Sequence, residues 1–390
     1  MRDKLTERQV VTPRAVSVAL LIGAIACWLA IGGGQALAAQ VKCGDTITTD
    51  TTLHADLVNC PNNGIVIGAN GITLDLNGHT IDGDGTPAAG CDPQTDFCDV
   101  GVANFGYDGV TVMHGSLRQF GGGVDFGEVR HNRLLDISAS RNADVGIQFF
   151  GSSRILIRTC SGNRTTSREG TGLGVFDSRH VRILHSSFRH NPHVGIKPVR
   201  TTNGVAKGNL VAHSGDEGFL MEGGEGFRIR HNRLVRNGAG IALGPGSNNV
   251  IARNRVLRGH DGIRIEKGHG NLVARNLVAH TRRAGIRLGI KHPFIGGAHN
   301  VLRGNLVSDS RVDGLLVGEK DRHSLLERNV ARRNGDDGFD VESRSATLTR
   351  NLAVDNGELG IEAVPGVLDG GGNRAHGNGD PRQCLNVVCN

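Results

Sequence analysis

The chain contains very few flat aromatic side chains. Its 390 residues include one Trp, one Tyr and 12 Phe. The Trp, Trp28, lies in the leader segment described below, so Tyr107 is the only Tyr or Trp beyond it. Sites for neutral sugars usually place Trp or Tyr against the sugar ring, and sites for single-stranded nucleic acid stack bases on aromatics. The composition therefore argues against a cellulose-like or chitin-like substrate and against a nucleic-acid partner.

Long apolar runs are also absent, apart from residues 15–31 near the start. This run follows a basic stretch and is followed by Ala36-Leu37-Ala38, a small-x-small cleavage pattern. It falls short of the roughly 20 residues that span a bilayer, although a retained membrane anchor is the alternative reading. We predict a signal peptide over residues 1–38 and a protein that is secreted or held in the periplasm or cell envelope, with no membrane contact after cleavage. Cleavage removes four Lys/Arg and two Asp/Glu and leaves a formal net charge of +4 instead of +6.

Seven cysteines remain after the leader, which suits an oxidising compartment. Sequence proximity suggests three disulfides, although connectivity cannot be deduced from sequence alone. The suggested pairs are Cys43–Cys60, Cys91–Cys98 and Cys384–Cys389. Cys160 is left over beside Ile155 and Ile157, and we expect it to be a buried apolar residue.

Asparagine and glycine recur at a fixed period through most of the chain. Asn209, Asn232, Asn254 and Asn276 are 23, 22 and 22 residues apart, and a Gly-apolar pair such as Gly262-Ile263 follows each one. A period of this length indicates a solenoid, and the short alternating apolar segments indicate strands. The sequence predicts an all-β, single-stranded right-handed parallel β-helix with about 22 residues per coil and about twelve coils. We expect it over residues 39–380, with an N-terminal cap, and a disulfide-closed tail over residues 381–390.

The recurring asparagines are interpreted as structural. Coils stack at about 4.8 Å, so inward Asn side chains can hydrogen-bond to the coils above and below.

The turn at Asp82-Gly83-Asp84 is explained by turn chemistry, with calcium as the alternative; no other cofactor is expected. Two insertions, ending at Gly101 and Gly174, leave from the same turn about 14 Å apart. They would either wall a groove or be neutral surface loops.

Residues 71–85, preceded by residues 43–47, resemble the opening of exported bacterial right-handed β-helix proteins. This pectate-lyase-like superfamily includes the carbohydrate-binding and sugar-hydrolase type repeats. The resemblance covers about residues 41–378. It implies the fold and not one activity, since such coils host lyases, hydrolases, epimerases and adhesins.

We call the glycine of each recurring Gly-apolar pair a Gly mark. The second residue after each Gly mark should face outward. This column places Lys197, Arg264 and Arg287 on one face, with Phe176 assigned to the same column, and Glu222 and Glu266 lie two positions after it. Pectate-lyase-like enzymes use Lys or Arg on such a sheet to remove a proton beside a uronate carboxylate. The same residue types also occur on any solvated strand face. The predicted catalytic residues are Lys197, Arg200, Glu222, Arg264 and Arg287.

Two family motifs are not matched. Polygalacturonase-like enzymes place an Asp-Asp pair before Gly-His-Gly, whereas Asp336-Asp337 follows Gly268-His269-Gly270 here. Mannuronan epimerases of this fold place Asp-Pro-His after a Gly-apolar mark, and the comparable Lys197-Pro198-Val199 lacks the histidine. Lys197, Arg200 and nearby His193 could still transfer a proton.

Histidines in Arg-His-Asn triplets, His131, His190 and His231, are interpreted as one basic outer column shared with arginines that precede other asparagines. No metal site is expected from them.

Two functions remain open. The first is an enzyme, of the polysaccharide-lyase type, or a binder that acts on an acidic, uronate-type polysaccharide. The alternative is a non-catalytic surface or envelope β-helix that serves as a binding platform or spacer. We expect a monomer.

Overall fold

The computed structural model describes residues 40–86, 98–289 and 296–390, and Val41–Asn390 form one compact unit. The predicted signal peptide lies outside these ranges. Every regular element described is a β-strand. No helix long and apolar enough to cross a membrane occurs in the described part of the chain.

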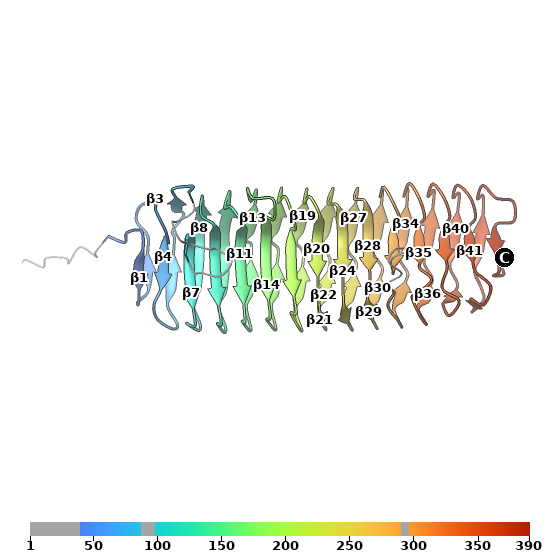
Figure 1. Cartoon of the computed structure of the whole chain (residues 1–390), viewed down its shortest axis with the longest axis horizontal. Coiled ribbons are helices and arrows are strands. Elements are labelled where there is room, and N and C mark those ends of the chain that lie inside the picture. Colours follow the sequence, from blue (N-terminus) through green and yellow to red (C-terminus); the bar gives the residue numbers. More distant parts are fainter. Residues whose placement is uncertain (1–39, 87–97, 290–295) are drawn as a thin grey trace, which may run out of the picture. The chain divides into compact units, whose positions relative to one another are not determined.

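One face of the solenoid is a 15-stranded parallel sheet, here called sheet A, which runs from β1 to β44 (Figure 1). Its strands, in order, are β1 (Asp45–Ile47), β4 (Ile65–Ile67), β7 (Val100–Phe105), β9 (Gly122–Gly127), β11 (Val145–Phe150), β14 (Thr171–Phe176), β17 (Ile196–Val199), β20 (Glu217–Met221), β24 (Ala239–Leu243), β28 (Asp261–Ile265), β32 (Ile286–Leu288), β35 (Leu315–Val317), β38 (Phe339–Val341), β41 (Ile361–Ala363) and β44 (Cys384–Leu385).

Two further rows of short strands close each coil, and the long strands β8 (Thr111–Arg118) and β10 (Arg133–Ser140) take part in both. The row that follows sheet A in each coil contains β2 (Thr51–Thr52), β5 (Thr73–Asp75), β12 (Leu156–Arg158), β15 (Arg182–Leu184), β18 (Val205–Lys207), β22 (Arg228–Arg230), β26 (Val250–Ala252), β30 (Leu272–Ala274), β33 (Val301–Arg303), β36 (Leu325–Glu327), β39 (Thr347–Thr349) and β42 (Leu368–Asp369). The next row contains β3 (Leu57–Cys60), β6 (Thr80–Gly83), β13 (Ser161–Asn163), β16 (Ser187–Arg189), β19 (Leu210–Ala212), β23 (Arg233–Val235), β27 (Arg255–Leu257), β31 (Leu277–Ala279), β34 (Leu306–Ser308), β37 (Val330–Arg332), β40 (Leu352–Val354) and β43 (Arg374–His376). A small sheet at one turn contains β21 (Gly224–Glu225), β25 (Gly246–Ser247) and β29 (Gly268–His269).

The predicted right-handed parallel β-helix is confirmed, with about 14 turns of about 23 residues each. The estimate of about twelve coils was too low. It counted glycine marks only, whereas sheet A also includes the cap strand β1 and the C-terminal strand β44, which pair with β4 and β41.

Alternating residues of each sheet A strand point inward and form the apolar core. Ile263 and Ile265 of β28 are fully buried and stack on Ile241 and Leu243 of β24. The glycine marks arise from close packing: a Cβ atom at Gly262 would overlap the carbonyl oxygen of Gly285 and a methyl group of Val278. A larger residue there would push adjacent coils apart.

The predicted asparagine ladder is confirmed. Asn209, Asn232, Asn254 and Asn276 are buried, and the backbone N–H of each donates to the side-chain oxygen of the next asparagine along the stack. The ladder continues to Asn373. Shorter ladders occupy the other turns, for example Asn334 to Asn378. Since buried backbone groups must find partners, the ladders make the tight turns possible.

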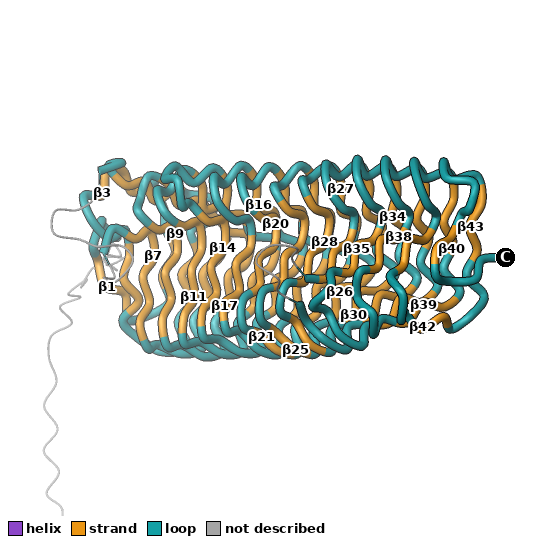
Figure 2. Tube along the Cα trace, turned by 45° about the vertical axis from the view of Figure 1, so that its right-hand side comes forward, coloured by secondary structure: helices purple, strands orange, loops and turns teal. Residues whose placement is uncertain are grey.

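A residue with positive φ lies at most turns, directly before an inward polar or apolar residue, and these turns stack in lines along the solenoid (Figure 2). The prediction that His131, His190 and His231 share one column is wrong. They lie at three different turns of the coil, because their N–H groups donate to Ser153, Ala212 and Ala252, which lie in three separate rows. The same Arg-His-Asn triplet serves each turn, so the sequence alone does not distinguish them.

Two of the suggested disulfides are confirmed within the part of the chain that the structure describes. Cys43–Cys60 closes the N-terminal cap with a Cα–Cα distance of 5.3 Å, and Cys384–Cys389 closes the C-terminal end with a distance of 6.2 Å. Cys91 lies outside the described residues. Cys160 is free and buried as expected, and burial raises the pKa of its thiol to about 11. The proposed groove between two insertions stays a prediction, since most of the first insertion also lies outside the described ranges.

Candidate functional site

The outward column of sheet A contains three of the five predicted site residues. The strand register aligns Gly174 with Lys197, Ala242 with Arg264, and Arg264 with Arg287. The assignment of Phe176 to this column was wrong, because Gly174 occupies the position and Phe176 pairs with Val199. The glycine that packs against the neighbouring coils in that turn is Gly172, two residues earlier than the sequence pattern suggested.

The structure brings only two predicted residues together. Arg264 and Arg287 are neighbours on β28 and β32. Lys197 lies on the same column three strands away, at β17, about 14 Å along the stack at the usual strand spacing. Glu222 is exposed just beyond β20, where it bridges to Val199. Arg200 lies in the turn after β17, outside the sheet face.

Arg200 is engaged at that turn by a bidentate pair with Asp177. Its Nε and Nη2 atoms donate to the two carboxylate oxygens at 2.6 Å each. The hydrogen bonds from Arg200 lower the pKa of Asp177. Both side chains are more than half exposed, so this pair is a surface feature of the turn and does not contribute to the sheet A site.

Arg264 and Arg287 are held by three carboxylates, of which the sequence placed only Glu266 near this face. Arg264 forms an ion pair with Glu217, and its Nε lies 3.2 Å from Oε1 of Glu266. Arg287 Nη2 lies 3.6 Å from Oδ2 of Asp261, whose side chain is 3% exposed. Desolvation raises the pKa of Glu217, and the nearby Arg264 opposes this effect. We call these five residues the sheet A network.

The contact between Glu217 and Arg264 spans three strands because the middle strand carries small residues. Glu217 on β20 and Arg264 on β28 are separated by β24, which places Ala239 and Ala242 at the aligned positions. Both alanines are buried. Their short side chains let the Arg264 guanidinium reach Glu217 two coils away. Glu217 and Asp261 each stand directly before a Gly mark. An acidic residue at that position is the sequence signal by which both could have been predicted as site residues.

Several polar atoms of the network are buried without a hydrogen-bond partner in the protein. They are Nε of Arg264, Nε of Arg287 and Oδ1 of Asp261. A buried donor or acceptor without a partner costs about 1–3 kcal/mol. The network therefore leaves polar atoms unpaired beneath its surface, while the Arg264 and Arg287 side chains are 25% and 17% exposed on the outward face, where a ligand can contact them. Sugar hydroxyls and carboxylates have the complementary groups.

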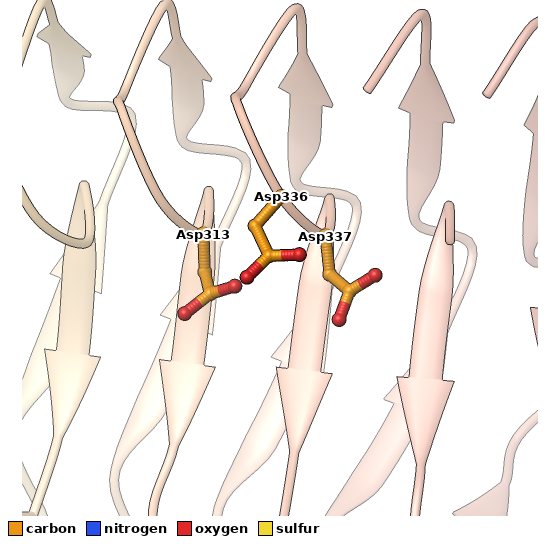
Figure 3. A group of neighbouring side chains, drawn as sticks. All are labelled: Asp313, Asp336 and Asp337. Atoms are coloured by element: carbon orange, nitrogen blue, oxygen red, sulfur yellow. The ribbon is translucent and has the colours of Figure 1, made fainter. Parts of the chain in front are cut away.

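A second polar group lies further along sheet A. Asp313, Asp336 and Asp337 converge so that one oxygen from each lies within 4.8 Å of the others (Figure 3). Asp337 accepts a hydrogen bond from the N–H of Leu359 at 2.7 Å. Desolvation, supported by the neighbouring Glu362, raises the pKa of Asp337 to about 8 despite that bond. Three carboxylates could ligate a hard cation such as calcium, and a proton held on Asp337 relieves the same repulsion.

The Asp82–Asp84 turn, considered for calcium from the sequence, is engaged within the protein. Asp82 pairs with Arg118 at 2.8 Å. Asp84 accepts hydrogen bonds from the backbone N–H and hydroxyl of Thr86, and these lower its pKa. These contacts are the turn chemistry that the sequence analysis favoured.

A family profile described as "Right handed beta helix region" matches residues 47–206 and 171–295. The matches together cover more than half of the chain, so the protein belongs to this family of right-handed β-helix proteins. No curated protein matches the sequence.

Solved structures share the architecture at low sequence identity. The catalytic domain of the GH87 alpha-1,3-glucanase in complex with nigerose has a TM-score of 0.54 and 13% identity, over 80% of this chain and 63% of that one. A mutant of the periplasmic alginate epimerase AlgG has a TM-score of 0.46 and 16% identity, over 79% of this chain and 64% of that one. The A-module of the Azotobacter vinelandii mannuronan C-5 epimerase AlgE4 has a TM-score of 0.44 and 14% identity, over 84% and 87%. The alignments cover less than two thirds of the glucanase and AlgG chains.

Proposed function

We propose that this β-helix binds an acidic polysaccharide on the outward face of sheet A, at the network of Glu217, Asp261, Arg264, Glu266 and Arg287. The observation that carries the proposal is the adjacent pair of partly exposed arginines, Arg264 and Arg287, held by carboxylates on one outward face. Guanidinium groups suit planar recognition of carboxylates, and the carboxylates of the network can accept hydrogen bonds from sugar hydroxyls. A protein of the same fold, the alpha-1,3-glucanase, was solved with the sugar nigerose.

Binding is better supported than β-elimination. A lyase needs an unprotonated base beside the uronate carbon and cations free to neutralise the carboxylate. Arg264 and Arg287 are already paired with carboxylates, so they are suited to hold a ligand and less suited to neutralise it. Lys197 has no ion pair among the described residues, yet it lies three strands from Arg264. The alternative, a non-catalytic platform, agrees with the same geometry.

The test compares binding of pectate and alginate oligomers to the wild type and to the double variant Asp261→Asn/Arg287→Gln. Removing both charges avoids leaving a buried carboxylate unpaired, which would destabilise the fold. We expect the affinity to fall about tenfold. Arg233→Gln is the control, because Arg233 is an exposed arginine on β23, away from sheet A.

The same preparations are incubated with the polymers while the ultraviolet absorbance of unsaturated uronate ends is followed. A rise that is abolished by Lys197→Ala would establish a lyase. Unchanged binding by the double variant, with folding verified by circular dichroism, would refute the sheet A site. Absence of binding to every acidic glycan would refute the function as a whole.

A further inference from the structure

A continuous column of basic side chains runs along the turn that leads back into sheet A. In seven successive coils, the position with positive φ is occupied only by arginine or histidine: Arg141, Arg164, His190, His213, Arg236, Arg258 and His280. Each backbone N–H donates to a carbonyl of the next coil, which fixes the register. At about 4.8 Å per coil, the column is about 29 Å long. We call it the Arg-His column.

Residue choice in the column goes against backbone preference. Glycine and asparagine adopt positive φ most easily, whereas other L-residues lose about 1–2 kcal/mol per residue there. The equivalent columns at the other two turns also contain arginine and histidine, for example Arg253 and Arg275, but glycine interrupts them, at Gly208 and Gly304 in one and at Gly226 and Gly270 in the other. An unbroken run of seven cationic or titratable side chains is therefore specific to one turn.

The charges of the column are available to a ligand. All seven side chains are exposed, and none of the four arginines forms an ion pair among the described residues. Two open grooves of about 420 and 630 Å³ lie along it, the first at Arg141, Arg164 and His190 and the second at Arg236 and Arg258. Further arginines, Arg189, Arg282 and Arg311, line the same grooves.

Carboxylates do occur elsewhere in the same turn, at Asp144, Glu169 and Asp216, but they do not line the two grooves. Among the described residues that line the grooves, the one carboxylate is Asp309, which follows His280 in the stack and is paired with Arg333 at 3.0 Å. The seven positions of the column are therefore all arginine or histidine, and Asp309 takes the next position in the stack.

Two histidines in the middle of the column add a flat surface. The rings of His190 and His213 stack with centroids 4.7 Å apart and an interplanar angle of 9°. Partial burial, together with the neighbouring charges of His190, Arg236 and Arg189, lowers the pKa of His213. A neutral imidazole next to arginines can donate a hydrogen bond to an anionic polymer without adding to the repulsion between the cations.

We infer that the Arg-His column is a binding surface for a linear polyanion with about one charge per repeating unit. The ligand would be an acidic polysaccharide that lies parallel to the solenoid axis. The ligand class rests on the proposed function, but the surface is distinct from the sheet A network. The column repeats at about 4.8 Å in a straight line, whereas each strand of a DNA duplex winds around the helix and places one phosphate per about 3.4 Å of its axis. It also contains no Trp, Tyr or Phe on which bases could stack. An acidic glycan therefore fits the surface better than a nucleic acid.

The test measures binding of polygalacturonate oligomers of increasing length by calorimetry at several salt concentrations. The variant Arg236→Gln/Arg258→Gln removes two cations from the middle of the column. Its matched control, Arg253→Gln/Arg275→Gln, removes two exposed arginines with the same positive φ from a different turn. We expect the column variant to lower affinity about tenfold and to reduce the salt dependence of binding, while the control changes little. Affinity of the wild type should rise with oligomer length until the column is filled.

The outcomes separate this inference from the proposed function. If Asp261→Asn/Arg287→Gln loses binding while the column variant does not, the sheet A site stands and the column inference is wrong. Equal losses in the column variant and its control would show a general charge effect, which also refutes the column. Tighter binding of single-stranded DNA than of polygalacturonate, lost in the column variant, would refute the choice of a glycan.

Discussion

Truncation of one asparagine in the ladder should destabilise the whole solenoid. Asn254 is 2% exposed, and its side-chain amide donates to the carbonyl of Ile229 at 2.8 Å and to Oδ1 of Asn276 at 3.1 Å. Its side-chain oxygen accepts from the backbone N–H of Asn232 at 2.9 Å and from that residue's amide at 3.0 Å. Asn254→Ala removes all four bonds.

The magnitude follows from the groups left behind. The backbone N–H of Asn232 and the carbonyl of Ile229 are buried and lose a partner, and each such loss costs about 1–3 kcal/mol. Asn276 keeps the bond from the Asn254 backbone N–H. We therefore expect Asn254→Ala to lower the free energy of unfolding by about 2–4 kcal/mol. Asn254→Asp should be worse at neutral pH, since it places a carboxylate against Oδ1 of Asn276.

The assay is guanidinium unfolding followed by circular dichroism, with hydrogen exchange to locate the loss. Asn248→Gly is the control: Asn248 is exposed, has a φ of +56° and bonds only to Glu225 through its side chain. Its replacement should change the free energy of unfolding by less than about 0.5 kcal/mol. If Asn254→Ala were as mild as the control, the ladder would not be the stabilising element that we infer.

Three further predictions concern the acidic cluster, the glycine stack and the cap. The pKa of Asp337 is about 8 in the fold and close to its ordinary value of 3.8 when unfolded, so the folded state binds more protons between these values and stability falls as pH rises. Lowering pH from 8 to 6 should add about 2 kcal/mol to the free energy of unfolding, and Asp337→Asn should remove that gain in pH-dependent unfolding. Gly262→Ala should destabilise by about 1–3 kcal/mol or more through overlap with the next coil, whereas Gly244→Ala, whose nearest neighbours lie 3.7 Å away, should be neutral in thermal melts. Replacing Cys43 and Cys60 by serine opens a loop with a sequence separation of 17 and should reduce stability by about 3 kcal/mol, measured against the oxidised wild type in denaturant unfolding.

The sequence was sufficient for the fold because each coil repeats the same local requirements. The spacing of Asn209, Asn232 and Asn254 reflects a hydrogen-bond ladder, and the spacing of glycines such as Gly262 reflects contact between backbones of adjacent coils. Both requirements recur at every coil, so the period is visible without an alignment. The register failed at Gly174 because an insertion precedes it and Gly172 offered an equivalent pattern two residues away.

The site was predicted only in part because its contacts cross coils. The outward positions of Arg264 and Arg287 follow from alternation along one strand. Their partners do not: Glu217 is 47 residues from Arg264, and the contact depends on small side chains at Ala239 and Ala242 between them. Arg200 was selected by its proximity in sequence to Lys197, although the chain turns away from the sheet between them.

The confusion of His131, His190 and His231 has a similar origin. Each turn needs a residue with positive φ followed by an inward residue, so one triplet can satisfy three different positions in the coil. Periodicity alone gives the spacing but not which of the three turns a triplet occupies, and the Arg-His column was therefore not separable from its neighbours in the sequence.

The stacking register makes one coil an interchangeable unit. The inward residue Ile241 of β24 pairs with Phe219 of β20 on one side and with Ile263 of β28 on the other. Loss of the intervening coil would bring β20 directly against β28 with apolar residues still facing apolar residues, and a duplication would insert a further matched layer. The length of this protein can therefore change in whole steps of about 4.8 Å during evolution or design, without redesign of the core, and each step adds or removes one position on every face.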